Sequence, residues 1–175
     1  RDENKLPQEI LPPQQELEIY DESIAAMQPG DLIALARAAE ENAFARDRRI
    51  QTTQDARCGV QINEVHFTNT ILGYQTYRST ACWLAVGAIA TEGGKMREGG
   101  YADRKRIFVD LETPERLGRR AADRALAKLG AAPIASTKAP VILENEAAGQ
   151  FLNGLFGAFN GQSVVQQRSF IAGRL

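Results

Sequence analysis

Residues 81–90 read ACWLAVGAIA, and this run decides the fold class. Both the odd and the even positions of the run are apolar, so it does not alternate between a solvent-exposed face and a buried face. A strand with this pattern is typical of a sheet centre that is covered on both faces. We therefore expect a central strand, with helices of this chain on one face and other protein on the opposite face.

The sequence on both sides of this run predicts neighbouring strands. Glu92-Gly93-Gly94-Lys95 is a hairpin signal, and Met96–Phe108 then returns as a polar, partly alternating strand. Gly99-Gly100 weakens that strand, which favours an edge position or a bulge. Residues 49–80, before the run, also predict strands, with a turn beginning at Asn69-Thr70.

One feature of the first strand is a change of phase. Cys58, Val60 and Ile62 are apolar on one parity, whereas Val65 and Phe67 are apolar on the other. An extra residue in one strand changes the parity of everything that follows it, so a bulge near residues 63–64 is expected.

Two helices are predicted around these strands. The first begins at Pro29, because proline fits the first helical position, where its missing N–H costs nothing. The second begins after Thr113, whose hydroxyl can cap the helix, and Gly130 is the expected residue just past its end. The apolar stripes comprise Leu32, Leu35, Ala36, Ala39 and Ala43 in the first helix, and Leu117, Ala121, Ala122, Ala125, Leu126 and Leu129 in the second. This pattern predicts an α+β domain, with a mainly antiparallel sheet and both helices packed on one of its faces.

The C-terminal residues 137–175 predict the strand–helix start of a second domain. Pro140–Leu143 is a short apolar run, and a helical pattern follows until Asn160-Gly161, which favours a helix stop. The apolar residues of this helix recur at spacings of three and four, at Ala148, Phe151, Leu152, Leu155, Phe156 and Phe159. We expect this apolar side to be exposed as a large patch, to be poorly ordered, or to be covered by a second copy of the molecule.

Three segments are therefore expected. Residues 1–27 carry Pro7, Pro12 and Pro13 without a sustained period, which is typical of an extended linker, although Asp21–Met27 has room for one helical turn. Residues 28–136 are expected to be the remainder of an N-terminal α+β domain, and 137–175 the truncated beginning of a C-terminal domain.

Composition excludes several classes of protein. The chain has 175 residues, 43% of them hydrophobic and 25% charged, with a net charge of -1, which is ordinary for a globular domain without a global basic field for nucleic acid. No apolar run is long enough to span a bilayer. Two cysteines make no disulfide framework, so free thiols and a reducing compartment are expected.

Few residues are candidates for chemistry. His66 is the only histidine, which excludes a catalytic triad or a histidine zinc site within this chain, and nothing local supports Cys58 as its nucleophilic partner. The helix from Thr113 is rich in arginine, but it also carries acidic residues, so a solvated face with local ion pairs is favoured over a phosphate-binding patch.

A family resemblance rests on the C-terminal stretch. KAPVIL at 138–143, the spaced Ala, Leu and Gly residues after it, and SFIAGRL at 169–175 resemble the PmbA/TldD family, the modulators of DNA gyrase or TldD/TldE metallopeptidases. The likeness also includes PGDLIALARAAEENA at 29–43 and TPERLGRRAADRALAKLG at 113–130. Within the family the chain is most similar to the PmbA (TldE) branch.

The branch decides what the resemblance implies about zinc. TldD-type chains carry a His-Glu-x-x-x-His helix, whose counterpart here, counted from Val141, has Asn153, Gly154 and Ala158 in place of His, Glu and His. Zinc is bound by imidazole, thiolate or carboxylate groups, so these residues cannot replace the ligands. A rival register on residues 145–150 keeps Glu146 but also lacks both histidines. No metal site and no catalytic residue are expected in this chain.

The resemblance implies a cytoplasmic heterodimer. A TldD-like subunit would hold the zinc and cleave peptides or unfolded protein, while this chain would shape the substrate chamber and hold the partner; a homo-oligomer is also compatible. Nucleic acid and membrane are not expected as partners. Two alternatives stay open: a non-proteolytic binding module of the gyrase-modulator type, and a full-length chain that is itself a metallopeptidase through ligands beyond Leu175.

Overall fold

The structure is a computed structural model that describes residues 17–71 and 73–173. The chain divides into two compact units, Arg1–Ala132 and Pro133–Leu175, which are described separately. In chain order the elements are α1 (Glu22–Ala26), α2 (Pro29–Phe44), β1 (Ile50–Asn69), β2 (Gly73–Glu92), β3 (Lys95–Lys105), the 3-10 turn η1 (Phe108–Asp110), α3 (Pro114–Leu126), α4 (Asn145–Ala158) and α5 (Gly161–Val165).

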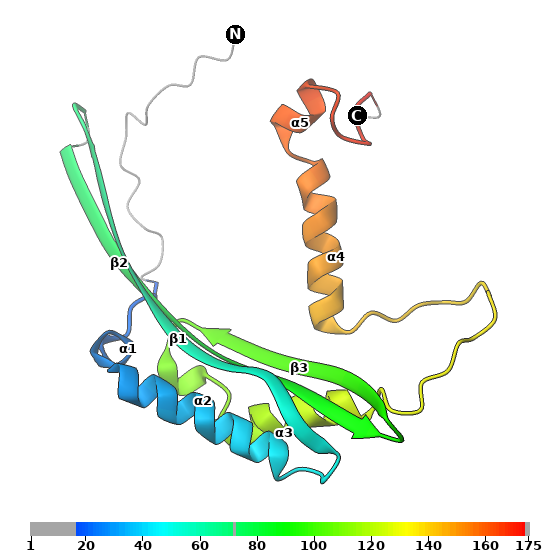
Figure 1. Ribbon diagram of the computed structural model, residues 1–175. Coiled ribbons are helices and arrows are strands. Elements are labelled where there is room, and N and C mark those ends of the chain that lie inside the picture. The colour runs from blue at the N-terminus through cyan, green and yellow to red at the C-terminus, as the bar shows by residue number, and fades with distance from the viewer. Residues whose placement is uncertain (1–16, 72, 174–175) are drawn as a thin grey trace. The chain divides into compact units, whose positions relative to one another are not determined.

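The first unit has an antiparallel three-stranded sheet in the order β1-β2-β3, as Figure 1 shows. β2 is the central strand and contains the whole 81–90 run, so the predicted central position is confirmed. Gly93 and Gly94 form the predicted hairpin turn with φ of +57° and +75°, which residues other than glycine seldom adopt. β3 is an edge strand, as its glycines indicated.

Helices α2 and α3 pack together on one face of this sheet, which confirms the predicted α+β arrangement (Figure 1). α2 begins at Pro29 with a capping box between Gln28 and Asp31, and the Thr113 side chain caps α3. The core between helices and sheet is made of small and branched side chains. Its fully buried members include Ala39, Ala43, Leu84, Ala88, Ala90, Leu117, Ala121, Ala122 and Ala125.

Two glycines allow the close approach of α3 to its neighbours. A Cβ on Gly118 would lie 2.1 Å from the carbonyl oxygen of Ala39 in α2. A Cβ on Gly99 of β3 would lie 2.1 Å from the backbone nitrogen of Ala125 in α3. These distances are far below van der Waals contact, so glycine is required at both positions.

The predicted bulge near residues 63–64 is wrong. The β1–β2 register runs without interruption from Asp55 to Asn69, and the irregularities lie between Ile50 and Thr52 and between Thr53 and Asp55. The change of phase has another cause: Val65 and Phe67 lie beyond the end of the helical layer, where both faces of the strands are exposed. No core there fixes which parity must be apolar.

The N-terminal part of this unit is anchored by Asp21. Residues 1–16 of the expected linker lie outside the described residues, while 22–26 form α1, whose Ile24 is fully buried. The Asp21 carboxylate accepts hydrogen bonds from the backbone N–H of Ser23 at 2.8 Å and of Phe108 at 2.8 Å. The Asp21 N–H donates to Thr80 Oγ1 at 2.9 Å, so the residue joins α1, β2 and η1.

We predict that Asp21→Ala lowers the free energy of unfolding by about 2 kcal/mol, because it removes a helix cap and leaves the Phe108 N–H without its acceptor. The hydrogen bond from Phe108, followed by that from Ser23, lowers the pKa of Asp21 below its ordinary 3.8. The charged form therefore stabilises the fold above pH 3.8, and its contribution is lost as pH falls through the folded-state pKa. Urea denaturation should show the variant and the wild type converging at acid pH.

The control for this prediction is Glu22→Ala, the next residue along the chain. Glu22 is exposed and forms a 4.0 Å ion pair with Arg78, which contributes little stability in water. A loss at Glu22 equal to that at Asp21 would contradict the assignment of the anchor to Asp21.

The second unit contains α4 and α5. Residues 140–143 form no strand, which corrects the expected strand: Val141 and Ile142 are 78% and 97% exposed, and an isolated segment has no neighbour for its backbone hydrogen bonds. The helix ends close to Asn160 as predicted, but by a different mechanism. The Asn160 side chain accepts a hydrogen bond from Ser163 N–H at 3.1 Å and caps α5, which begins at Gly161.

Candidate functional site

The positions that the resemblance aligns with a zinc motif, Asn153, Gly154 and Ala158, lie on α4. Asn153 and Gly154 are exposed and Ala158 is partly buried. The apolar side of the same helix is exposed, which is the first of the three expected alternatives: Phe151, Leu155, Phe156 and Phe159 are 61%, 36%, 66% and 59% exposed. α4 therefore presents aromatic side chains next to positions that carry one amide and no ionisable group.

These residues do not fit a zinc ion. Gly154 and Ala158 have no side-chain donor atoms, and the amide of Asn153 is a poor ligand for zinc. In the rival register Asn145 accepts a hydrogen bond from the Glu146 N–H at 2.9 Å at the start of α4. Among the described residues, no group of three or more His, Cys, Asp or Glu is placed to hold a metal ion.

The single histidine is far from the cysteine that was considered as its partner. His66 is exposed, stacks on Tyr74 with ring centroids 5.7 Å apart, and has Nε2 3.5 Å from Glu64 Oε1. Cys58 is eight residues earlier on β1, about 26 Å away at ~3.3 Å per residue. Burial raises the pKa of the Cys58 thiol, so it stays protonated and unreactive near neutral pH.

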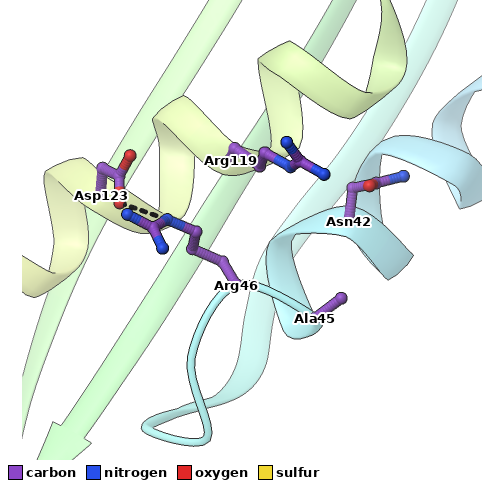
Figure 2. Close-up of a pocket in the computed structure, with 5 residues that line it drawn as sticks. All are labelled: Asn42, Ala45, Arg46, Arg119 and Asp123. Carbon is purple, nitrogen blue, oxygen red and sulfur yellow. Dashed lines mark hydrogen bonds and ion pairs between the residues drawn. The ribbon is translucent and has the colours of Figure 1, made fainter.

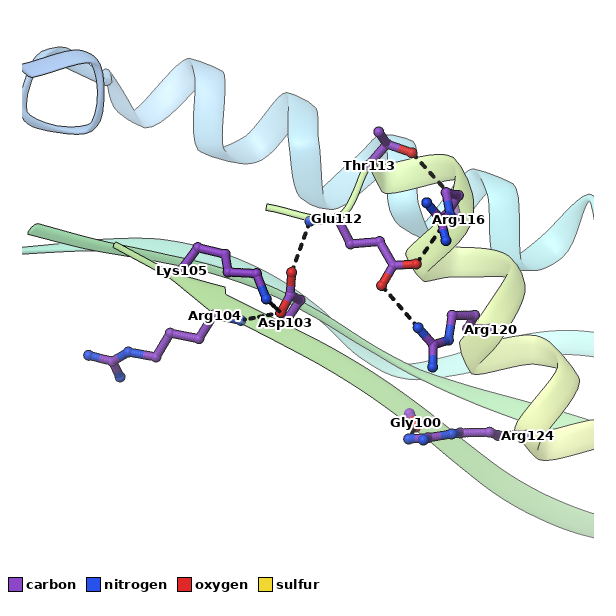
Figure 3. Close-up of polar contacts among 9 residues, drawn as sticks. All are labelled: Gly100, Asp103, Arg104, Lys105, Glu112, Thr113, Arg116, Arg120 and Arg124. Carbon is purple, nitrogen blue, oxygen red and sulfur yellow. Dashed lines mark hydrogen bonds and ion pairs between the residues drawn. The ribbon is translucent and has the colours of Figure 1, made fainter. Parts of the chain in front are cut away.

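The arginine side chains of α3 make local contacts within the protein, as predicted from the acidic residues near them in the sequence (Figure 3). Glu112 pairs with Arg116 at 3.4 Å and with Arg120 at 3.2 Å. The guanidinium of Arg120 lies 3.9 Å, and that of Arg124 4.8 Å, from the centre of the Tyr101 ring. These cations are thus oriented toward the protein and not assembled into a phosphate-binding patch.

Asp103 connects β3 to the segment before α3 (Figure 3). Its carboxylate accepts hydrogen bonds from Lys105 Nζ at 2.8 Å and from the Glu112 N–H at 2.9 Å. Burial by itself raises the pKa of Asp103, but these hydrogen bonds outweigh it and hold that pKa below its usual range. The carboxylate is therefore charged at neutral pH and has a structural role.

A shallow pocket between α2 and α3 was not foreseen from the sequence. Its lining is Asn42, Ala45, Arg46, Arg119 and Asp123. Figure 2 shows Arg119 pointing toward Asn42, while Arg46 turns to Asp123 and pairs with it at 2.7 Å. Because the guanidinium groups diverge and one is already neutralised, the pocket does not have the geometry of an anion site.

Within the described residues no helix is long and apolar enough to cross a membrane.

Comparison with known families places both units. A model of the PmbA/TldA metallopeptidase central domain matches residues 22–129, and a model of the PmbA/TldA metallopeptidase C-terminal domain matches residues 136–175. Metalloprotease PmbA of Escherichia coli O157:H7 is 34% identical over 147 residues, which cover 84% of this chain and 33% of that protein. A Metalloprotease PmbA homolog of Buchnera aphidicola subsp. Acyrthosiphon pisum is 29% identical over 140 residues, 79% of this chain and 31% of that protein.

Solved structures share the fold. A protein described as a candidate modulator of a DNA gyrase, from Thermotoga maritima, superimposes with a TM-score of 0.79 at 27% identity, over 92% of this chain and 37% of its own. TldE from Thermococcus kodakarensis has a TM-score of 0.68 at 18% identity, over 92% and 36%, and supports the fold alone. The chain spans about a third of the length of the curated relatives it matches.

Proposed function

The chain belongs to the PmbA/TldD metallopeptidase family, and from this membership we propose that it is part of a PmbA/TldE-type subunit of a TldD/TldE-type zinc metallopeptidase complex. In this proposal a TldD-like partner holds the zinc and cleaves peptides or unfolded protein. This chain contributes structure to the substrate chamber and holds the partner, in the cytoplasm.

The observation that carries the proposal is the character of α4. At the positions where a TldD-type helix has His, Glu and His, this helix has Asn153, Gly154 and Ala158, which supply neither a zinc ligand set nor a general base. The aromatic side of the same helix is exposed, which suits contact with other protein. A helix of this kind can line or cover a site whose metal belongs to another chain.

The alternative function, a non-proteolytic DNA gyrase modulator, has less support from the site. Binding to DNA requires lysine and arginine side chains that are available to phosphates. On α3, Arg116 and Arg120 instead pair with Glu112, and Arg124 donates to the Gly100 carbonyl at 3.1 Å.

Co-purification tests the proposal. The full-length protein that contains this chain should co-elute at micromolar concentration with a TldD-like protein from the same genome, and peptide cleavage should require both. The control is the same mixture with a TldD-like variant whose zinc-motif histidines are replaced by alanine, which should associate without cleaving. If the two proteins do not associate, or if the full-length protein cleaves equally well alone, the proposal is wrong.

A further inference from the structure

The β1–β2 pair extends well beyond the three-stranded sheet (Figure 1). β3 pairs with β2 only from Cys82 to Glu92, whereas β1 continues to pair with β2 as far as Asn69 and Gly73. Residues 62–69 and 73–80 therefore form a two-stranded ribbon. Isolated hairpins are marginally stable in water, so a ribbon of this length is expected to rest on something.

The two faces of the ribbon differ in chemistry. Side chains alternate along a strand, and Leu84 is buried beneath the helices, so even-numbered β2 residues share the helical side. On that side the ribbon carries the charged Glu64 and Arg78, the exposed Ile62, and the stacked rings of His66 and Tyr74. The opposite side carries Val65, directly paired with Tyr77, and Phe67.

This opposite side of the ribbon is uncharged and partly apolar. Val65, Phe67 and Tyr77 are 36%, 40% and 54% exposed. Its other positions are polar but uncharged: Asn63, Asn69, Gly73, Gln75 and Ser79. Both sides of the ribbon carry exposed apolar or aromatic groups, but only the side with Val65, Phe67 and Tyr77 has no charged side chain.

The same side of the strands continues onto the sheet, where it also carries charged side chains. Trp83, Ala85 and Ile89 of β2 lie on the same side, away from α2 and α3, and are half-buried. Trp83 lies flat across β1, because Gly59 has no side chain: a Cβ there would be 2.2 Å from the indole ring. We call this surface, formed by Val65, Phe67, Tyr77, Trp83, Ala85 and Ile89, the open face.

Charged side chains lie on the sheet part of the open face, since Arg57 is directly opposite Ala85 and Arg104 directly opposite Trp83. Arg57 and Asp55 of β1 form an ion pair at 3.0 Å. Arg104 of β3 stacks on Trp83 at 5.4 Å from the ring centre and donates to Gln61 at 2.6 Å. Aromatic and arginine side chains together are typical of protein–protein interfaces, and because Arg57 and Arg104 already have partners on this face, they do not favour nucleic acid.

The size of the open face also indicates a protein subunit. With ~3.3 Å per residue and ~4.8 Å between strands, the ribbon offers roughly 200 Å² and the sheet below it roughly 500 Å². Stable interfaces bury about 800 Å² per partner. Only the ribbon and sheet together approach that area, so the occupant is expected to be a folded surface that spans both.

We propose that the open face is the surface through which this chain binds the TldD-like subunit. The proposal rests on the proposed function and specifies where the partner binds. The ribbon supplies the aromatic contacts, Trp83 lies at their base, and the charged helical side of the ribbon stays in solvent.

The two faces of the ribbon supply a matched pair of variants for the test. Val65→Asp with Tyr77→Asp alters one cross-strand pair on the open face, and His66→Asp with Thr76→Asp alters the adjacent cross-strand pair on the other side. All four residues are exposed and each double variant places two carboxylates on one cross-strand pair, so both should lower the unfolding temperature slightly and by the same amount. Binding to the TldD-like protein is measured by titration calorimetry.

The open-face variant is expected to weaken binding at least 100-fold, because it places carboxylates in an apolar contact, while the control pair should change Kd less than about threefold. A milder variant, Val65→Ser with Tyr77→Ser, should weaken binding about tenfold without adding charge. Wild-type affinity in both open-face variants would overturn this inference and leave the proposed function standing.

The remaining outcomes separate the two proposals. If the wild-type protein itself does not bind the TldD-like protein, the proposed function fails and this inference fails with it. If the open-face variants lose self-association, measured by light scattering, but bind the TldD-like protein normally, the occupant is a second copy and the inference is overturned.

Discussion

Gly118→Ala is expected to destabilise the first unit by about 3 kcal/mol, a large part of the 5–15 kcal/mol that typically stabilises a domain. The added methyl would lie 2.1 Å from the Ala39 carbonyl oxygen and 2.9 Å from the Ala43 nitrogen. Both are backbone atoms of α2, so no side chain can move aside and the two helices must separate. Alanine is favoured over glycine in a helix by about 1 kcal/mol, which offsets only part of this cost.

Gly30→Ala is the matched control for that substitution. It makes the same chemical change in a helix of the same unit, but no atom lies within 4 Å of the added Cβ. Chemical denaturation of the full-length protein should show Gly30→Ala neutral or slightly stabilised and Gly118→Ala strongly destabilised. Equal stabilities for the two variants would contradict the close contact between α2 and α3.

Local signals in the sequence were sufficient to predict the framework of the first unit. Pro29 and Thr113 mark helix starts through capping, which depends on residues within one turn. The 81–90 run predicted the central strand, because apolar residues on both parities suit a strand buried on both faces. These features depend on residues that are close in sequence, so they can be predicted without knowing the tertiary fold.

Contacts between distant segments were not predictable in the same way. Within a helix or strand, glycine is expected only to weaken the element. Nothing near Gly118 in the sequence therefore indicated that α2 lies against it, and nothing near Gly99 indicated the contact with α3. The sequence shows the change of phase at Val65 and predicts a bulge there, but the strand register is uninterrupted. The change of phase marks the point along β1 where the core under the helices ends and an exposed apolar surface on the other side of the strands begins.

The candidate site was predicted from the family resemblance more than from the residues. Asn153, Gly154 and Ala158 carry no pattern of their own, and only their alignment with a zinc motif gives them meaning. The apolar side of α4 was predictable from the helical period of its sequence. The strand predicted before it was wrong, because a strand needs a neighbouring strand to pair with, and four apolar residues do not specify one.

The second large effect concerns the metal. Because Asn153, Gly154 and Ala158 cannot bind zinc, chelation of the assembled complex should abolish peptide cleavage through the partner's site alone. Removing zinc from the TldD-like subunit before mixing should give a complex that forms but does not cleave. Replacing Asn153 by alanine in this chain should leave cleavage in the reconstituted complex within about twofold, since the amide supplies no chemistry to the reaction.

The zinc content of the separated subunits tests the central claim most directly. The full-length protein that contains this chain is purified alone and in complex with the TldD-like protein, and zinc is measured by mass spectrometry in each sample. We predict zinc near stoichiometry in the complex and in the isolated TldD-like subunit, and only trace zinc in the isolated full-length protein. Near-stoichiometric zinc in that isolated protein, lost on chelation together with a peptidase activity of its own, would contradict the account.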